Sequence, residues 1–306
     1  MNKRLLLVDH NALLHRCRNA LLKTGRKYTT SEGIPTTGVF SYLNSLLSII
    51  EQQSPSHVIV CFDAGGNSRK EESEDYKANR APLDPEFMCE SRILLNEALY
   101  AMGIESVGLR GYEADDLLHT FAHCAQYGKE RFEEVIIATV DQDLLQCVSD
   151  RCAVLLWNGV KKQQMMWVND VLEKWDCSPA DICMIKALSG DSSDNIKGIP
   201  GIGKKTAIKI FKECQGNPGA ILEHKKVREH AKTLGKNLEL IRLRFCAEPL
   251  GDLCWGDYEL GKGMLHDWTE LLEKYELSSI AKRLNKTKVV LGLRELAEPE
   301  PSLIAR

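Results

Sequence analysis

Three short apolar runs, each ending at an aspartate, limit the fold of this chain more than any other feature. The runs cover residues 4–8, 57–62 and 134–140. The aspartates that follow them are Asp9, Asp63 and Asp141. Runs without polar alternation are typical of strands buried on both faces, as in a parallel sheet covered by helices. We therefore predict an α/β protein with a mostly parallel sheet flanked by helices.

Amphipathic segments between and after these runs are expected to supply the helices. Before the third run they cover residues 11–22, 37–50, 84–102 and 113–126. Two further strands are expected at residues 152–157 and 165–168. Further helices are expected from residue 178 to 188, at 237–245 and at 265–284.

Acidic residues are expected to gather at one edge of this sheet. Ligand sites in open parallel sheets lie outside the carboxyl ends of the strands. A single aspartate after a strand is commonly explained by its preference for turns. An aspartate after each of three strands indicates a site. More acids follow Asp141 and precede residue 195. Others stand at the start of the helix at residue 113, where they are more numerous than helix capping needs. The set comprises Asp9, Asp63, Glu113, Asp115, Asp116, Asp141, Asp143, Asp191 and Asp194.

So many carboxylates indicate a divalent metal, because unpaired acids cannot be buried together without cations. Oxygen donors without clustered His or Cys favour Mg²⁺ or Mn²⁺ over zinc. His119 and His123 have a zinc-like spacing, but they lack a third ligand nearby and are interpreted as ordinary helix residues.

The polar segment 65–92 contains cations and one aromatic directly after Asp63. Tyr76 and Arg80 share a helical face, and Lys77 lies beside them. An aromatic flanked by cations suits base stacking with phosphate neutralisation. A solvated loop has the same composition, so composition leaves both interpretations open.

A basic stretch contrasts with this acidic body. Residues 186–244 contain 13 Lys or Arg and 6 Asp or Glu, whereas the whole chain has a net charge of −3. This asymmetry indicates a nucleic-acid partner, although a solvated basic face would show it too. The glycines of residues 198–203 allow backbone N–H groups to converge on a phosphate at a helix start. The spacing falls short of a P-loop, because Lys205 stands at the Ser/Thr position.

Composition limits the compartment. The chain is 43% hydrophobic and 27% charged, which is ordinary globular composition, and no apolar run approaches the roughly 18 residues that span a bilayer. The apolar run near the N-terminus is too short for a signal peptide. Eleven cysteines without a Cys-x-x-Cys pair are interpreted as reduced thiols. We expect a cytoplasmic protein with no membrane partner.

Several motifs resemble those of the 5′-nuclease family, which includes flap endonucleases and the 5′→3′ exonuclease domain of bacterial DNA polymerase I. GDSSDNIKGIPGIGKKTA at residues 190–207 is similar to the family's helix–three-turn–helix motif, and DYKANR at 75–80 to its helical arch. YEADD at 112–116 resembles its central acidic motif, and TVDQDLLQ at 139–146 its metal motif. The resemblance covers residues 3–285. It implies a PIN-like α/β body, a helical arch and a helix–three-turn–helix DNA-binding module.

The resemblance also implies a role for each acid. Two divalent ions, Mg²⁺ or Mn²⁺, are expected. The first would bind Asp9, Asp63, Glu113 and Asp115. The second would bind Asp141, Asp143 and Asp191, with Asp116 and Asp194 bridging or acting through water.

For the nucleic acid, the resemblance implies contacts in the arch and in the module. Tyr76 is expected to stack on the nucleotide beside the cleaved bond. Lys77, Arg80 and Arg16 are expected to stabilise the reacting phosphate. The expected duplex contacts are Gly198, Gly201, Gly203, Lys204, Lys205 and Thr206. The carbonyls expected to bind K⁺ are those of Lys197, Ile199 and Ile202.

The resemblance thus implies a structure-specific DNA 5′-nuclease acting on 5′ flaps and 5′ ends. We expect a stand-alone monomer of phage or bacterial type, in the cytoplasm of a bacterial or phage-infected cell. The expected domains are a nuclease body over 1–175 with an arch at about 65–92, a DNA-binding module over 176–260 and a C-terminal part over 261–306. Two alternatives stay open, a PIN-type ribonuclease and a non-catalytic protein that binds DNA junctions.

Overall fold

A six-stranded sheet forms the centre of the molecule. The computed structural model describes residues 3–25, 28–66, 69, 73, 75–79, 85–157 and 162–295. The strand order is β3-β2-β1-β4-β5-β6, parallel throughout except that β6 runs antiparallel to β5. The strands are β1 (Arg4–Asp9), β2 (His57–Cys61), β3 (Glu105–Val107), β4 (Glu134–Thr139), β5 (Cys152–Trp157) and β6 (Gln163–Met166). The predicted α/β architecture with a mostly parallel sheet is confirmed.

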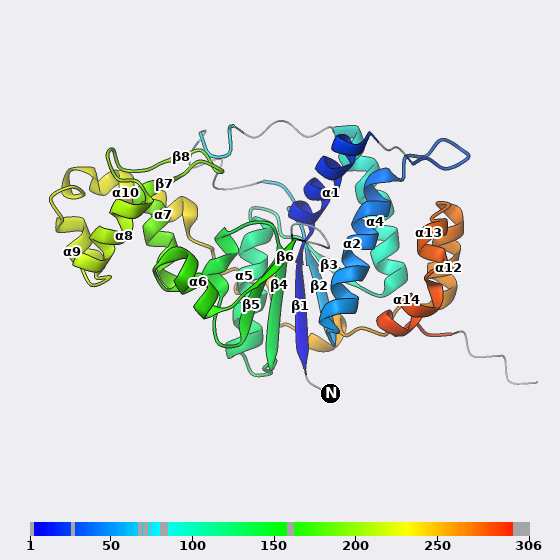
Figure 1. Ribbon diagram of the computed structural model, residues 1–306. Coiled ribbons are helices and arrows are strands. Elements are labelled where there is room, and N and C mark those ends of the chain that lie inside the picture. The colour runs from blue at the N-terminus through cyan, green and yellow to red at the C-terminus, as the bar shows by residue number, and fades with distance from the viewer. Residues whose placement is uncertain are drawn as a thin grey trace, which may run out of the picture.

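Two cores cover the two faces of the sheet, because successive strand residues point to opposite sides. Leu5 and Leu7 of β1 face α5 (Ala114–Tyr127), whereas Leu6 and Val8 face the other side. That second side is covered by α1 (His10–Thr24), α2 (Thr37–Gln53) and α4 (Pro85–Met102) (Figure 1).

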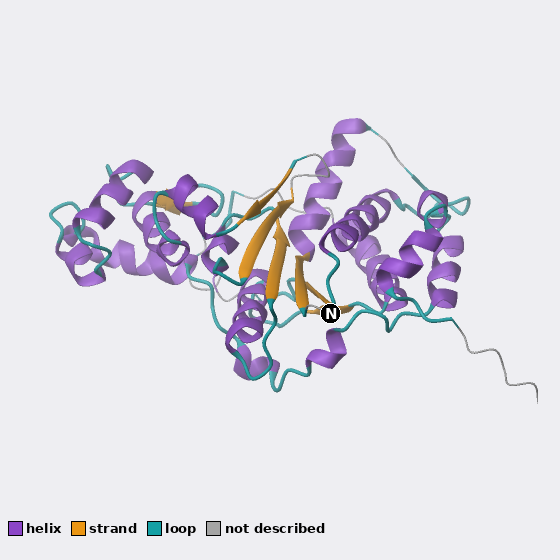
Figure 2. Ribbon diagram, turned by 60° about the horizontal axis from the view of Figure 1, so that its bottom comes forward, coloured by secondary structure: helices purple, strands orange, loops and turns teal. Residues whose placement is uncertain are grey.

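Helical groups lie at the two ends of the sheet, as both ribbon views show (Figures 1 and 2). We call residues 177–245 the helical module; it packs on the α5 side. Its elements are η2 (Pro179–Asp181), α7 (Ile182–Ser189), β7 (Gly190–Asp191), β8 (Ile196–Lys197), α8 (Lys204–Glu213), α9 (Pro218–Glu223), η3 (Arg228–His230) and α10 (Ala231–Ile241). The remaining elements are η1 (Asp143–Cys147), α6 (Val168–Trp175), α11 (Ala247–Leu250), η4 (Trp255–Tyr258), α12 (Leu265–Lys274), α13 (Ser278–Ala281) and α14 (Leu284–Leu291).

The helix predicted at 237–245 is wrong in its bounds, because α10 ends at Ile241. Side chains of α5 take up the backbone N–H groups that would have continued this helix. The N–H of Arg244 donates to Asp116 Oδ1 (2.8 Å), and the N–H of Cys246 donates to Thr120 Oγ1 (3.0 Å). The chain therefore leaves the helix extended and tied to α5.

Other predicted elements also need correction. The single helix expected at 265–284 is interrupted at Glu276, whose φ of 51° is incompatible with a right-handed helix. The N–H of Ser31 donates to the carboxylate of Glu276 (2.9 Å) and fixes this break from another part of the chain. The strand expected at 165–168 covers 163–166, and the three-residue strand β3 is too short to be detected from its sequence.

Two further observations concern the helices and the cysteines. Within the described ranges, no helix combines the length and the apolar character that crossing a bilayer requires. The cysteines whose side chains are described are free thiols, and most of them are buried.

Candidate active site

Three neighbouring strands bring three aspartates to one edge of the sheet. Since β2, β1 and β4 are adjacent, Asp63, Asp9 and Asp141 stand next to one another at the carboxyl ends of these strands. Asp9 accepts hydrogen bonds from the N–H of Ala12 (2.9 Å) and from Oγ1 of Thr139 (2.8 Å). The carboxylate is thereby held at the start of α1.

The other two strand-end aspartates are held by helix starts in the same way. Asp63 accepts hydrogen bonds from Asn11 Nδ2 (2.5 Å) and from the N–H of Ala114 (2.7 Å) at the start of α5. Asp141 accepts a hydrogen bond from the N–H of Asp143 (2.9 Å) at the start of η1. Helix N-termini carry unpaired N–H groups and favour negative charge. Each strand–helix junction therefore fixes one carboxylate.

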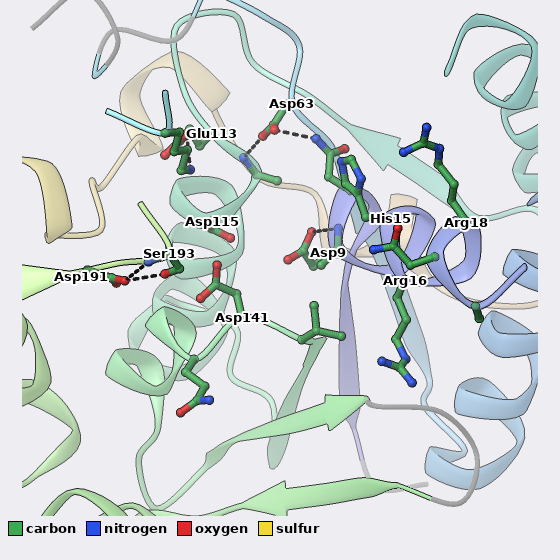
Figure 3. Close-up of a pocket in the computed structure, with 18 of the residues that line it drawn as sticks. Asp9, His15, Arg16, Arg18, Asp63, Glu113, Asp115, Asp141, Asp191 and Ser193 are labelled. Carbon is green, nitrogen blue, oxygen red and sulfur yellow. Dashed lines mark hydrogen bonds and ion pairs between the residues drawn. The ribbon is translucent and has the colours of Figure 1, made fainter. Parts of the chain in front are cut away.

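A cavity of about 970 Å³ opens at this edge (Figure 3). Six acids from five segments of the chain line it. They are Asp9, Asp63, Glu113, Asp115, Asp141 and Asp191.

Two of these acids, Asp9 and Asp115, are disfavoured in their ionised form. Burial, together with repulsion from Asp141 and Asp63, raises the pKa of Asp9 to about 6, although its hydrogen bonds oppose the shift. Burial also raises the pKa of Asp115 well above its ordinary value, and the charges of Asp141 and Asp9 add to this. The pocket therefore offers oxygen donors whose charge is uncompensated, which is what a hard divalent cation binds.

Two lysines neutralise other acids at the rim. Lys186 of α7 contacts Asp143, and its Nζ lies 2.6 Å from Asp191 Oδ2. Lys77 Nζ lies 2.5 Å from Glu113 Oε1 and 3.8 Å from Asp194. Although burial raises the pKa of Asp191, the hydrogen bond and charge of Lys186 lower it overall. Each lysine occupies a position between two acids where a cation is favoured.

Three of the predicted metal ligands do not line the cavity. Asp143 and Asp194 are turned to the two lysines. Asp116 is fully buried at 0% exposure, and its carboxylate is bound by the guanidinium of Arg69. Across the described part of the chain, no three His, Cys, Asp or Glu side chains are grouped closely enough to hold a metal as they stand. Lys77 and Lys186 each lie between the two acids that they contact.

The described part of the predicted arch is folded onto the site. Tyr76 is 4% exposed, and its hydroxyl donates to Glu113 Oε2 (3.0 Å), so its ring does not face solvent as a stacking platform would. Lys77 has a φ of 56°, and its N–H donates to the carbonyl of Asp194 (3.0 Å). Asn79 Nδ2 donates to the carbonyl of Ser192 (2.9 Å). Arg80 lies outside the described residues.

A basic wall faces the acids across the cavity. Figure 3 shows the acids on one side and His15, Arg16 and Arg18 of α1 on the other. Arg16 was expected there. Asn19 and Lys23 also line the cavity. The four-residue spacing of positions 15, 19 and 23 places His15, Asn19 and Lys23 on one helical face, and this was the sequence signal for these three residues.

The glycine-rich hairpin of the module, which we define as residues 190–203, is closely packed against α7. A Cβ added at Gly198 would lie 2.2 Å from the backbone of Ser189, so only glycine fits. Asn237 of α10 donates from Nδ2 to the carbonyls of Ala187 and Lys197, each at 2.9 Å. The carbonyl of Ile199 accepts from the N–H of Ile202 (3.0 Å). The conformation of the hairpin is thus set by the module's own helices.

The predicted duplex contacts lie at the start of α8. Gly203 precedes the helix, Gly201 has a φ of 75°, and Lys205 is exposed. Lys204 is also exposed, and its Nζ lies 3.6 Å from the centroid of the Trp175 ring. Thr206 is half-buried in the first turn.

Sequence reasoning missed several residues of the site. Lys186, Trp175, Ser193, Asn11 and Gln142 line the cavity but were not singled out. Lys186 lies five residues before Asp191, a separation that predicts no contact in a helix. The pairing exists because the chain reverses after α7 at Gly190, whose φ is 83°.

Two family models match the chain. The model described as 5′–3′ exonuclease, N-terminal resolvase-like domain, matches residues 4–176, and 5′–3′ exonuclease, C-terminal SAM fold, matches 177–245. A 5′–3′ exonuclease of Bacillus subtilis is 32% identical over 306 residues, covering 96% of this chain and 99% of that protein. The thermostable DNA polymerase I of Thermus thermophilus is 35% identical, covering 97% of this chain and 35% of that protein.

Solved structures share the fold at lower identity. A bacteriophage T5 protein co-crystallised with metal ions has a TM-score of 0.60 and 20% identity, covering 94% of this chain and 98% of that chain. Flap endonuclease-1 from Methanococcus jannaschii has a TM-score of 0.62 and 17% identity, covering 95% of this chain and 93% of that chain. The mostly parallel sheet with an attached helical domain is therefore a known arrangement.

The family follows from these matches together with the geometry. One family model covers more than half of the chain, and the Bacillus relative aligns over nearly its full length. The strand-end aspartates and the acidic start of α5 belong to the part matched by the first model. This chain is a member of the 5′–3′ exonuclease family of nucleases.

Proposed function

We propose that this chain hydrolyses phosphodiester bonds of DNA at 5′ flaps and 5′ ends. The observation that carries the proposal is the cavity itself, in which six acids face a basic wall on α1. An acidic cluster suits metal binding, and cations opposite it suit a phosphate backbone. Structural neighbours include a bacteriophage T5 flap endonuclease with DNA and metal ions and the catalytic core of Rad2 with DNA substrate.

The proposed metals are two divalent ions, Mg²⁺ or Mn²⁺. The proposed ligands in the cavity are Asp9, Asp63, Glu113, Asp115, Asp141 and Asp191. Asp143 and Asp194 would join these ligands once Lys186 and Lys77 release their carboxylates. Asp116 would act indirectly, through the hydrogen bond that it accepts from the N–H of Glu113. Bound ions would supply an activated water and stabilise the charge on the attacking and leaving oxygens. The donor chemistry fits, since buried carboxylates repel one another here.

The basic residues of the site would act on the phosphate. Lys77, held by Glu113 in this structure, would turn to the reacting phosphate when the acids are occupied. Arg16 would approach it from the α1 wall, and Arg80 from the arch. Tyr76 would leave its contact with Glu113 to stack on the adjoining base.

The helical module would hold the duplex next to the cleaved strand. Its hairpin and the start of α8 would contact phosphates through backbone N–H groups and lysines, without reading sequence. The carbonyls of Lys197, Ile199 and Ile202 are proposed to hold K⁺ between protein and DNA. A carbonyl oxygen has two lone pairs, so the bonds that Lys197 and Ile199 already accept do not prevent this. We further propose a monomer acting in the cytoplasm.

Cleavage of defined substrates tests the proposal. A 5′-labelled flap, a nicked duplex and a single strand are incubated with Mg²⁺ and K⁺, using wild type, Asp141→Asn and the exposed control Asp150→Asn. We expect cleavage of the flap and the nicked duplex by wild type and the control. Asp141→Asn should lose cleavage but keep DNA binding in Ca²⁺.

Four outcomes would contradict parts of the proposal. Full activity of Asp141→Asn would exclude the metal assignment. Faster cleavage of an RNA flap than of the matching DNA flap would favour a ribonuclease. Binding without hydrolysis in Mg²⁺ or Mn²⁺ would leave a junction-binding protein. An unchanged duplex affinity when Na⁺ replaces K⁺ would exclude the K⁺ site.

A further inference from the structure

Arg69 is a buried arginine that joins three distant parts of the chain. It is 2% exposed, and its guanidinium forms a two-pronged contact with Asp116, at 2.9 Å from Nη1 to Oδ2 and 2.6 Å from Nη2 to Oδ1. Nη2 also donates to the carbonyl of Arg242 (2.9 Å), directly after α10. The predicted arch, the start of α5 and the end of the module therefore meet at one side chain.

The pair is tightly constrained by burial. A two-pronged arginine contact fixes the plane of the carboxylate. Asp116 also accepts from the N–H of Arg244 (2.8 Å) and the N–H of Glu113 (3.2 Å). The carboxylate of Asp116 thus anchors the arginine and closes the first turn of α5.

The same guanidinium reaches into the candidate active site. Its Nη1 lies 2.7 Å from Oε2 of Glu113, the acid that lines the cavity. Oε2 is also bound by the Tyr76 hydroxyl, whereas Oε1 is turned to Lys77 at the cavity. Arg69 therefore holds one oxygen of Glu113 from behind and leaves the other directed at the site.

We infer that Arg69, anchored by Asp116, is a positioning residue that fixes the orientation of Glu113 for metal binding and catalysis. The inference rests on the proposed function. It assigns Asp116 to support of the site rather than to direct coordination. Groups that orient a metal-binding carboxylate commonly change affinity or activity by about 10–100-fold when removed.

A double variant without either charge distinguishes a role in positioning Glu113 from a role in stabilising the fold. Arg69→Met alone would leave Asp116 charged and buried, and would destabilise the fold for that reason. Arg69→Met combined with Asp116→Asn removes both charges and keeps an acceptor for the N–H of Arg244. Arg69→Lys keeps the charge but cannot form the two-pronged contact. Arg131→Met, at an exposed arginine, is the control.

Three quantities are measured for each variant: Tm, Mn²⁺ affinity without DNA, and kcat and KM on the 5′ flap. We expect the neutral double variant to fold, with Mn²⁺ affinity and kcat each lower by about 10–100-fold and KM changed less than about threefold. Arg69→Lys should fall between wild type and the double variant. Arg131→Met should match wild type.

If Arg69 only stabilises the fold, the variants give a different result. A folded double variant with Mn²⁺ affinity and kcat within about threefold of wild type would overturn the inference. If the double variant does not fold, Arg69→Lys is used instead, and Mn²⁺ affinity and kcat within about threefold of wild type would overturn the inference. If wild type cuts none of the DNA substrates, the proposed nuclease function fails, and the Mn²⁺ affinities of the folded variants still decide the role of Arg69.

Discussion

Two acidic residues of the site are buried close to other negative charges, and both effects disfavour their ionised form. The strand-end aspartates each have one oxygen bonded at a helix start, which holds the carboxylate but does not neutralise it. Lys77 and Lys186 compensate other acids at the rim, such as Glu113 and Asp191. The charges of Asp9 and Asp115 are left uncompensated.

Asp9→Asn should change how stability depends on pH in metal-free protein. The folded-state pKa of Asp9, about 6, exceeds its ordinary value of 3.8. Stability is therefore fully present below about pH 4 and is lost as the pH rises through about 6, by roughly 3 kcal/mol. The variant should lose much of this step, gain Tm at pH 7.5 and lose cleavage.

The measurement is Tm against pH in a chelating buffer, with the exposed Asp150→Asn as the matched control. The control should keep the wild-type pH profile. An Asp9→Asn profile that coincides with that of wild type would show that Asp9 titrates at an ordinary pKa.

Lys186→Met should make the chain more dependent on metal. Removing this cation leaves Asp143 and Asp191 without their shared partner, which for a buried pair costs about 3–5 kcal/mol. We expect a lower Tm without metal and a larger rise of Tm on addition of Mg²⁺ than in wild type. Equal rises of Tm in both proteins would mean that Lys186 does not take the place of a metal ion.

At the scale of elements, the hairpin after α7 is fixed by a close backbone approach. Gly198 lies against Ser189 and Gly190, and Asn237 of α10 bonds the carbonyls on both sides of the hairpin. The hairpin also contains Asp191, so its backbone geometry positions both an acid of the cavity and the proposed duplex contacts.

Gly198→Ala should displace the hairpin. The added methyl group would lie 2.2–2.5 Å from backbone atoms, which overpacks the site and costs about 1–3 kcal/mol. We expect flap affinity in Ca²⁺ to fall at least about tenfold. Gly235→Ala in α10 has open space around its Cβ and should be neutral or stabilising by up to about 1 kcal/mol. Equal affinity of the two variants would contradict the role of the hairpin.

At the scale of the whole molecule, most acids of the cavity lie apart from the lysines of α8, and only Asp191 among those acids belongs to the module. The cavity lies at the carboxyl ends of the central strands, and the module lies at one end of the sheet (Figure 2). α8 and its lysines belong to the module, whereas the strand-end aspartates belong to the body. Binding of the duplex and cleavage should therefore respond to different substitutions.

Replacing Lys204 and Lys205 together by glutamine should weaken binding without slowing chemistry. We expect KM to rise and kcat at saturating DNA to stay near wild type. The slope of log affinity against log salt should fall by about 0.9 for each lost phosphate contact. Flap binding and cleavage measured from low to high salt check this, and an unchanged slope would show that these lysines do not contact phosphates.

The sequence by itself determined the sheet and the gathering of acids. Uninterrupted apolar runs can be buried only between two helical layers, and aspartates that end adjacent parallel strands must share an edge. Asp9, Asp63 and Asp141 were predictable for this reason, as was the helix start that carries Glu113 and Asp115. These inferences need strand ends and local spacing alone.

The tertiary structure decided which partner each charged side chain meets. The same carboxylate type lines the cavity at Asp115 and is locked by Arg69 at Asp116, one residue later. The contacts of Lys186, Tyr76 and Arg69 join residues up to 173 positions apart or across a reversal of the chain. Such pairings depend on how the arch, α5 and the module pack together, and spacing along the sequence carries no information about that packing.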